Sequence, residues 1–229
     1  MGGGRVPGPL GAGGTCISTP GPTGAGERTR LEDFKRAVLD AQISHLLHKG
    51  RHFFAALPAS ELEVIEGKQR MRRPAAAKCR ELLAAAREEL KKAQEAGDAR
   101  ARNTKSVVVH SAYRTMDEDK AAWQKTFRKH YQAMLDKGTF AGDPLGPGAL
   151  RYMVHKLIPL KAPPGYSNHS NGAAVDFGTT FGGVYYKADS STRREWRKTW
   201  LHPWLLENAA AFGFKPLKTE EWHWDFEES

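Results

Sequence analysis

Residues 167–176 of this chain read Ser-Asn-His-Ser-Asn-Gly-Ala-Ala-Val-Asp, and this stretch decides how the rest of the sequence is read. Gly172 permits a sharp turn and two alanines follow it, so a loop delivers His169 and a short strand then presents Asp176. An imidazole and a carboxylate brought together in this way suit zinc, which binds histidine nitrogen at about 2.0–2.1 Å and carboxylate oxygen at about 2.0–2.2 Å.

A zinc site of this kind needs a third protein ligand, and the end of the chain offers one. His223 lies between Trp222 and Trp224, whose indole rings would keep the site dry and rigid. Two histidines and one carboxylate leave the fourth position of a tetrahedral zinc for water, which is typical of catalytic rather than structural zinc. We therefore predict a metal site built from His169, Asp176 and His223.

The other histidines and the cysteines give no convincing second metal site. His45, His48 and His52 could share one helix face, but a glycine interrupts that helix and no carboxylate completes a ligand set. Cys16 and Cys79 are the two cysteines of the chain, too few for a disulfide framework or for a structural zinc held by thiolates.

Outward from the central stretch, the chain mixes strand and helix patterns. Residues 105–114 are β-branched and predict a buried strand, and residues 173–178 and 221–226 predict two shorter strands. Helices come first and a mixture of short strands and helices follows, so we predict an α+β fold, with a small antiparallel sheet that carries the zinc site, flanking helices and a helical N-terminal segment. Helical patterns cover residues 31–47, 58–67, 74–97, 117–135, 149–158 and 192–211, the last opened by a capping box of Thr192 and Glu195.

The composition of the 229 residues is that of a globular chain with a basic surface. Its hydrophobic fraction of 40% and its charged fraction of 27% lie near the averages of globular proteins. The formal net charge of +9 predicts attraction to polyanions. Nucleic acid is not the partner we expect, because the basic run from Lys68 to Arg102 is mostly a solvated helix pattern.

The motifs resemble those of the D-alanyl-D-alanine carboxypeptidase family of zinc peptidases, which includes vancomycin-resistance enzymes and phage endolysin endopeptidases. Residues 167–176 match its S-x-H-x-x-G-x-A-x-D pattern, and residues 111–114 are similar to its S-x-Y-R strand end. The family's last motif has an acid three residues before the histidine of a Trp-His pair, and Glu220, followed by Trp222 and His223, is similar to it. The motifs follow the family's order over residues 105–226, and the long stretch before the central motif suggests an insertion.

The sequence predicts three parts of the chain, and the resemblance covers only the last of them. Residues 1–26, mostly Gly and Pro, are predicted to be a flexible tail. Residues 27–100 are predicted to be a helical N-terminal segment, and residues 101–229 the zinc peptidase domain, whose wider structural group includes a hedgehog-like zinc fold.

The resemblance also implies a role for each site residue. Zinc lowers the pKa of its bound water toward about 7, which provides a nucleophile at neutral pH. Glu220 would take the proton of that water and pass it to the leaving amine, and Arg114 would hold the developing oxyanion. Ser167 and Tyr166, next to the metal loop, are expected to bind substrate.

Two neighbouring glutamates compete for the role of base. In an ideal strand, residues two apart share a face, so Glu221 would point the same way as His223. The family's spacing instead selects Glu220, which requires the chain to bend before Trp222. Lys218 and Thr219 lie where a turn could provide that bend.

We expect zinc-dependent hydrolysis of an amide bond in peptidoglycan stem or cross-link peptides. A D,D-carboxypeptidase and an L-Ala-D-Glu-type endopeptidase both remain open, since the family's motifs are common to them. The basic charge favours a wall-lytic enzyme, because bacterial wall polymers are anionic. The alternative is a non-catalytic, zinc-containing module that binds the cell wall, and the presence of Glu220 and Arg114 beside all three ligands argues against it.

The sequence also predicts where the protein is made. No apolar run in it matches a secretory signal or approaches the roughly 20 residues of a membrane span. We expect synthesis in the cytoplasm without a signal peptide, and action on the cell wall after lysis or non-classical export. A delivery apparatus or an immunity protein would then be a further partner.

Overall fold

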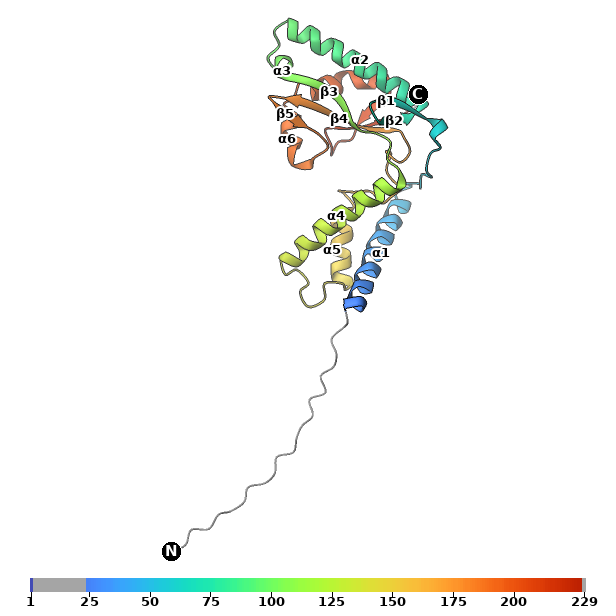
Figure 1. Cartoon of the computed structure of the whole chain (residues 1–229), viewed down its shortest axis with the longest axis vertical. Coiled ribbons are helices and arrows are strands. Elements are labelled where there is room, and N and C mark those ends of the chain that lie inside the picture. Colours follow the sequence, from blue (N-terminus) through green and yellow to red (C-terminus); the bar gives the residue numbers. More distant parts are fainter. Residues whose placement is uncertain (2–23, 228–229) are drawn as a thin grey trace.

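The computed structural model of the chain describes residue 1 and residues 24–227. The predicted flexible tail, with Cys16, therefore lies almost entirely outside the described residues. Two hydrophobic cores organise the described part, one under a β-sheet and one among three helices, and the two lobes stand one above the other in Figure 1. No helix within the described ranges is long and apolar enough to cross a membrane.

The upper lobe contains the antiparallel sheet that the sequence predicts. Its strand order is β3-β4-β7-β6, with β5 paired to the far end of β4. All of these pairs are antiparallel, which confirms the predicted α+β fold. The strands are β3 (Thr104–Ser111), β4 (Ala174–Phe181), β5 (Val184–Tyr186), β6 (Phe214–Pro216) and β7 (His223–Phe226).

The register of the two central strands separates a core face from a polar face. Val175 of β4 pairs with Trp224 of β7, and both side chains lie in the core. The next pair along is Asp176 with His223, so these two side chains project from the opposite face of the sheet. Ser111, at the end of β3, is paired with Asp176 from the other side.

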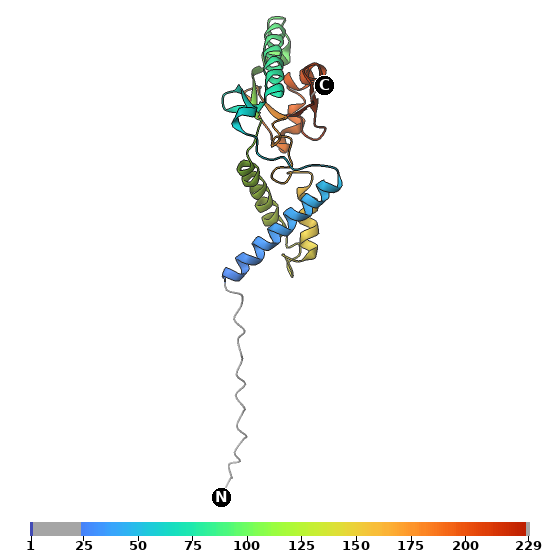
Figure 2. The same ribbon diagram turned by 90° about the vertical axis from the view of Figure 1, so that its right-hand side faces the viewer.

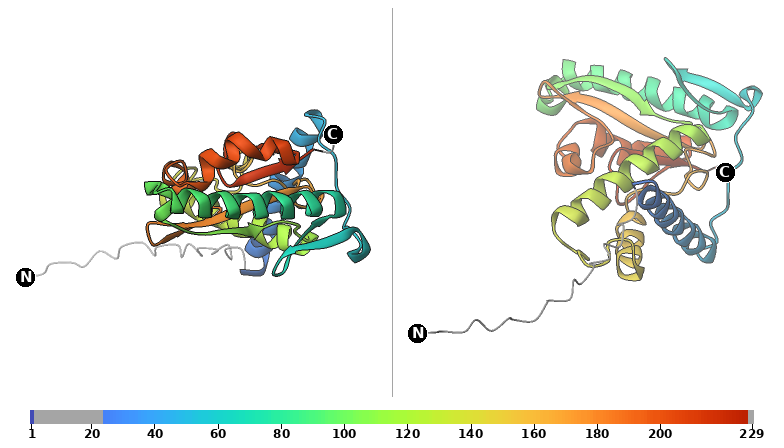
Figure 3. Two further views of the ribbon diagram at one scale, coloured as in Figure 1. Left: turned by 90° about the horizontal axis from the view of Figure 1, so that it is seen from above. Right: turned by 60° about the horizontal axis from the view of Figure 1, so that its bottom comes forward.

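Helices cover the core face of the sheet. Helix α2 (Arg73–Glu95) packs Leu82, Leu83 and Ala86 into the same core as β3 and β4, and the short helices before β6 complete this layer (Figure 3). The α2 sequence is rich in Ala, Leu and Glu and has Pro74 in its first turn, which explains its length and its starting point. A single turn, α3 (Ala99–Arg102), leads from it into β3.

The lower lobe is built from three helices that are distant in sequence. Helices α4 (Met116–Asp136) and α5 (Pro147–Leu157) are inserted between β3 and β4, which accounts for the long stretch between the first two motifs. Helix α1 (Gly24–His48) crosses both in Figure 2. Their shared core contains Phe34 and Val38 from α1 and Trp123 and Phe127 from α4.

The predicted helix over residues 58–67 is wrong. After a 3-10 turn, η1 (Ala59–Glu61), the chain forms a hairpin of β1 (Leu62–Glu66) and β2 (Gln69–Arg72). Val64 and Ile65 are β-branched and favour a strand. Gly67, at φ +56°, supplies the left-handed residue that the hairpin turn needs.

The predicted capping box at Thr192 and the single helix after it are also wrong. The Thr192 side chain makes no capping bond and instead donates to the Asp189 carbonyl at 2.9 Å. Proline cannot lie in a helix interior without breaking it, and Pro203 instead falls in the first turn of a new helix. The segment is thus divided into η2 (Ser190–Thr192), α6 (Arg193–Trp196), α7 (Leu201–Asn208) and η3 (Ala209–Phe212).

The predicted turn at Gly172 is confirmed and can be tested by substitution. Gly172 has φ +66°, and a Cβ there would lie 2.9 Å from Leu57 Cδ1 and 3.1 Å from the backbone nitrogen of Arg72. Gly138 has φ +64° with open space around it. Both Gly→Ala variants adopt a strained backbone, but only Gly172→Ala also forces neighbouring chain apart. We expect Gly172→Ala to lower the free energy of unfolding by about 1–3 kcal/mol more than Gly138→Ala in urea titrations. Equal losses would contradict this packing.

Candidate metal centre

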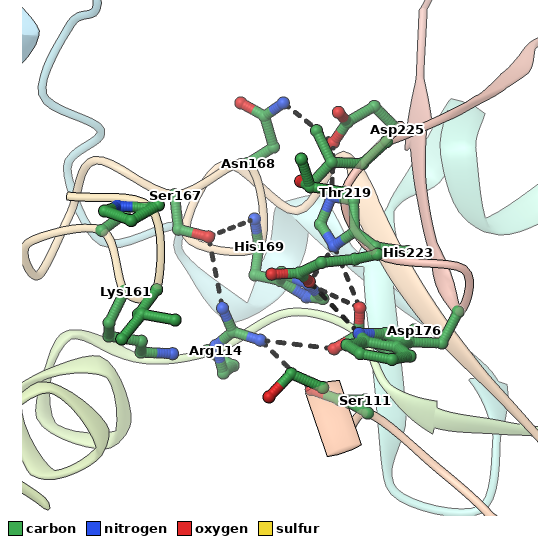
Figure 4. Close-up of a pocket in the computed structure, with 18 of the residues that line it drawn as sticks. Ser111, Arg114, Lys161, Ser167, Asn168, His169, Asp176, Thr219, His223 and Asp225 are labelled. Atoms are coloured by element: carbon green, nitrogen blue, oxygen red, sulfur yellow. Dashed lines mark hydrogen bonds and ion pairs between the residues drawn. The ribbon is translucent and has the colours of Figure 1, made fainter. Parts of the chain in front are cut away.

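Three side chains from the polar face of the sheet and the adjoining loop meet at one buried point (Figure 4). Asp176 Oδ1 lies 3.0 Å from His223 Nδ1 and 3.3 Å from His169 Nε2, and the two imidazole nitrogens are 3.1 Å apart. All three residues are buried. Within the described ranges they form the single group of at least three His, Cys, Asp or Glu residues whose ligand atoms converge in this way.

The hydrogen bonds behind the two imidazoles decide which nitrogen faces the group. His169 Nδ1 lies 2.6 Å from the Ala112 carbonyl oxygen, which can only accept, so Nδ1 carries the proton and Nε2 offers a lone pair. His223 Nε2 lies 3.0 Å from Asp225 Oδ1 and donates to that carboxylate, so its Nδ1 also offers a lone pair. Asn168 holds Asp225 in place with a hydrogen bond of 2.8 Å.

Three polar atoms that can each offer a lone pair, facing one another in a buried space, need a positive charge among them, which a proton or a metal ion can supply. The separations of 3.0–3.3 Å are close to the edge of about 3.3–3.4 Å of a tetrahedron with ligand bonds of about 2.0–2.1 Å. The donor set of two imidazoles and a carboxylate is also one that zinc prefers. These residues therefore fit a zinc ion.

The electrostatics of His169, Asp176 and His223 also favour a cation at this point. Burial opposes a positive charge on His223, but Asp176 and Asp225 outweigh it and raise the pKa of His223 to about 9. Burial alone would raise the pKa of Asp176, yet the two imidazoles bring it well below its usual range. A metal ion binding at neutral pH would thus replace a proton at a place where the protein already stabilises positive charge.

A cavity of about 830 Å³ opens beside this group, between the sheet lobe and the helical lobe. Arg114, Ser167 and Glu220 line it together with the three predicted ligands, so the structure brings these predicted site residues together. Tyr166 does not line the cavity. Its ring is buried edge-on against Phe53, with ring centroids 5.8 Å apart, because the metal loop turns it away from the opening.

The chain bends ahead of β7, as the choice of Glu220 requires. The Glu220 backbone N–H donates to the Leu217 carbonyl at 3.0 Å, and the His223 N–H donates to the Glu220 carbonyl at 3.1 Å. These two turns put the Glu220 side chain in the cavity wall, where Trp222 Nε1 donates to its carboxylate at 3.2 Å. Burial raises the pKa of Glu220 above its ordinary value.

Glu221 points elsewhere and is already engaged. Its carboxylate is buried and accepts hydrogen bonds from Arg193 Nε at 2.7 Å and from Arg197 Nη2 at 2.6 Å. Burial would raise its pKa, but the two guanidinium groups outweigh this and lower the pKa to about 2. Strand alternation is thus a poor guide here, because Glu221 precedes β7 and lies in a turn.

Arg114 is held rigidly at the cavity wall. Its Nε donates to Asp119 Oδ1 at 2.8 Å, its Nη2 donates to Ser167 Oγ at 3.2 Å, and its Nη1 lies 3.7 Å from Asp176 Oδ2. Asp119 is buried at the start of α4, so the helical lobe fixes the position of this arginine.

Sequence reasoning missed several polar residues of the site. Asp225 could have been predicted from the sequence, because it lies two residues after His223 on the same strand and therefore on the same face. The sequence indicated Asn168 less clearly, only through its place next to His169 in the motif. No sequence pattern indicated Asp119 or Lys161, because these residues reach the site only through the packing of α4 and α5.

The segment between α1 and β1 lies directly on the metal loop. The Phe54 N–H donates to the Gly165 carbonyl at 2.7 Å, and the Leu57 N–H donates to the Tyr113 hydroxyl at 3.2 Å. Arg51 Nη2 donates to Asn168 Oδ1 at 3.2 Å, and Asn168 in turn holds Asp225. The N-terminal part of the chain is therefore in contact with the surroundings of the metal centre.

Comparison with known proteins now places this geometry in a family. The sequence model of the D-alanyl-D-alanine carboxypeptidase family, VanY, matches residues 68–229, well over half of the chain. The chain belongs to this family. The match begins before residue 105, where the recognised motifs begin, so the VanY-like part also takes in β2 and α2.

Several solved structures are similar to the chain. VanYB in complex with D-alanine-D-alanine is 23% identical over 75% of this chain and 81% of its own, with a TM-score of 0.47. A zinc-bound mutant of the vancomycin-resistance D,D-pentapeptidase VanY is 22% identical over 75% and 82%, with a TM-score of 0.46. The LD-carboxypeptidase LdcB is 20% identical over 74% and 69%, with a TM-score of 0.46. No curated protein sequence matches the chain significantly.

We predict one zinc per chain and near-complete loss of it in His169→Ala, measured by elemental analysis of the purified protein. Asp225→Asn keeps the ligands but weakens the hydrogen bond that orients His223, so its zinc affinity should fall about 10–100-fold. His155→Ala, on the exposed side of α5, is the matched control and should keep its zinc. Full zinc occupancy in His169→Ala would refute the site.

Proposed function

We propose that this protein is a zinc-dependent peptidase that hydrolyses an amide bond in the peptides of bacterial peptidoglycan. The observation that carries the proposal is the buried convergence of His169, Asp176 and His223 next to a cavity whose wall presents Glu220 and Arg114. Membership of the D-alanyl-D-alanine carboxypeptidase family supports this reaction class and this substrate class.

In the proposed reaction, His169, Asp176 and His223 hold the zinc ion. When bound, zinc supplies a Lewis acid and lowers the pKa of water at the site. Asp225 and the Ala112 carbonyl engage the outer nitrogen of each imidazole, so His169 Nε2 and, once its proton leaves, His223 Nδ1 would be the nitrogens that hold the ion.

Glu220 fits the role of general base. It lies in the cavity wall and its only recorded hydrogen bond among the described residues is from Trp222, so its carboxylate is available to accept a proton from the attacking water. Its raised pKa brings it closer to neutral pH, where a group can both accept a proton and then give it to the leaving amine.

Arg114 fits the role of oxyanion stabiliser. Asp119 and Ser167 hold its guanidinium group in place, so its charge is positioned before substrate arrives. The group also lies near Asp176, so a carbonyl attacked at the metal centre would develop its negative charge within reach of Arg114.

The alternative function is a wall-binding module that keeps the zinc fold without catalysis. A module of that kind would have no use for a carboxylate in the cavity wall that pairs with no cation among the described residues, which is what Glu220 provides. We also propose, from the sequence, that the protein acts on the cell wall after lysis or non-classical export, with a delivery apparatus or an immunity protein as further partners.

The test compares two isosteric variants. Glu220→Gln keeps the shape of the turn but cannot accept a proton, so hydrolysis of purified muropeptides, followed by mass spectrometry, should fall by about 10²–10⁴-fold while the zinc content holds. Glu221→Gln removes a buried partner of Arg193 and Arg197, so it should lower the melting temperature and cost far less activity.

A larger loss of activity in Glu221→Gln than in Glu220→Gln, with zinc and fold retained, would contradict the assignment of the base. A parent protein that carries zinc and binds peptidoglycan but releases no product would contradict the enzyme and support the binding module.

A further inference from the structure

Residues 51–57, here called the linking segment, connect α1 to the β1–β2 hairpin and lie against the metal loop. The first half of the segment is held at two points. The Phe54 N–H donates to the Gly165 carbonyl at 2.7 Å. The Phe53 ring lies edge-on to the ring of Tyr166, with ring centroids 5.8 Å apart. These contacts fix the segment at the start of the metal loop.

The second half of the linking segment is held further along the same loop. The Leu57 N–H donates to the Tyr113 hydroxyl at 3.2 Å. A Cβ at Gly172 would lie 2.9 Å from Leu57 Cδ1, so the Leu57 side chain packs directly on the turn of the metal loop. The linking segment thus follows the loop that carries His169 from its start to its turn.

Arg51 joins the linking segment to the metal centre through three hydrogen bonds in series. Its Nη2 donates to Asn168 Oδ1 at 3.2 Å. Asn168 Nδ2 donates to Asp225 Oδ1 at 2.8 Å, and His223 Nε2 donates to the same oxygen at 3.0 Å (Figure 4). His223 is one of the three predicted metal ligands. This hydrogen-bond chain therefore leads from Arg51 to a residue that would hold the ion.

The amide of Asn168 gives this hydrogen-bond chain a direction. Its carbonyl oxygen can only accept and its nitrogen can only donate. A donor at Arg51 and an acceptor at Asp225 therefore select one orientation of the amide. If the amide turned over, its oxygen would face the carboxylate and its NH₂ group would face the guanidinium, and both contacts would be repulsive. Arg51 can thus act on His223 without touching it, by orienting Asn168.

Nothing else in the described part of the chain does the same work. Arg51 is the one recorded donor to Asn168 Oδ1 among the described residues, and it pairs with no carboxylate there. The next residue, His52, is exposed and makes no recorded side-chain contact within the described ranges. The effect on Asn168 is therefore specific to one position of the linking segment.

We propose that Arg51 is a positioning residue of the metal centre, which raises the affinity for zinc by orienting Asn168 and Asp225 and, through them, His223. This inference rests on the proposed function and deepens it, because it adds a support that lies outside the matched family model. That match begins at residue 68. The linking segment is then part of the metal centre rather than a separable accessory.

The expected effect is smaller than that of Asp225. A group that hydrogen-bonds directly to a metal ligand contributes about 10–100-fold to metal affinity. Arg51 acts through two intervening side chains and is exposed, so water competes for its N–H groups. We expect removal of its donor to weaken zinc binding about 3–10-fold.

The experiment measures the zinc dissociation constant of the full chain by competition with a chromophoric chelator, a readout that needs no turnover. Arg51→Gln should raise the dissociation constant about 3–10-fold without lowering the melting temperature of the zinc-free protein. Arg51→Lys keeps a cationic donor and should recover part of the loss. The matched control is His52→Ala, which should bind zinc as the parent does.

A double-mutant cycle separates the hydrogen-bond chain from general loosening of the loop. If Arg51 acts through Asn168, Arg51→Gln should cost nothing further in an Asn168→Ala background. Unchanged zinc affinity in Arg51→Gln, or the same loss with and without Asn168, would overturn the assignment. If Asn168→Ala fails to fold, Asp225→Ala takes its place, because it breaks the same chain of bonds one step nearer His223.

These outcomes are independent of the proposed hydrolysis. A protein that shows the coupling between Arg51 and Asn168 yet cleaves no peptidoglycan peptide would refute the proposed function and leave Arg51 in its role. A protein that cleaves such peptides with zinc but shows no coupling would refute the role of Arg51 alone.

Discussion

The structure depends on one electrostatic constraint, the convergence of three lone pairs from His169, Asp176 and His223 on a single buried point. Such a group repels itself unless a cation lies within it, and burial makes that repulsion stronger because water cannot screen it. The protein holds the group from behind, with the Ala112 carbonyl and the Asp225 carboxylate. A positive ion at this point is therefore what the surrounding fold is arranged to stabilise.

The two lobes contribute different parts of this arrangement. The pairing of β4 with β7 puts Asp176 and His223 side by side, and the core beneath them keeps that register, since a slip by one residue would turn both toward the hydrophobic face. The helical lobe positions two of the cavity's cations, because Asp119 of α4 holds Arg114 and Gln42 of α1 holds the backbone of Lys161. Ligands thus come from the sheet and its loop, the turns before β7 position Glu220, and the helical lobe positions Arg114.

Local patterns explain why much of the centre could be predicted from the sequence. His169 and Asp176 lie in one short motif, and Glu220 and His223 lie in another, so the spacing within each motif was enough to predict the metal ligands and the base. The strands around them were predicted from runs of β-branched residues. The β1–β2 hairpin was missed because its five-residue strand resembles a short helical run in a charged region. Pro203 shows that a single residue can divide an expected helix, and Tyr166 shows that proximity in sequence does not decide which way a ring faces. Lys161 could not be found, because its place depends on α1 and α5 packing together.

The most direct test of the central claim is anomalous diffraction from zinc-loaded crystals, measured on both sides of the zinc absorption edge. The account predicts one strong anomalous peak, about 2.0–2.2 Å from His169 Nε2, Asp176 and His223 Nδ1, with the remaining side of the ion open to the cavity. A peak at His45, His48 and His52 instead, or an ion at the predicted point with a fourth protein ligand closing it off from the cavity, would contradict it.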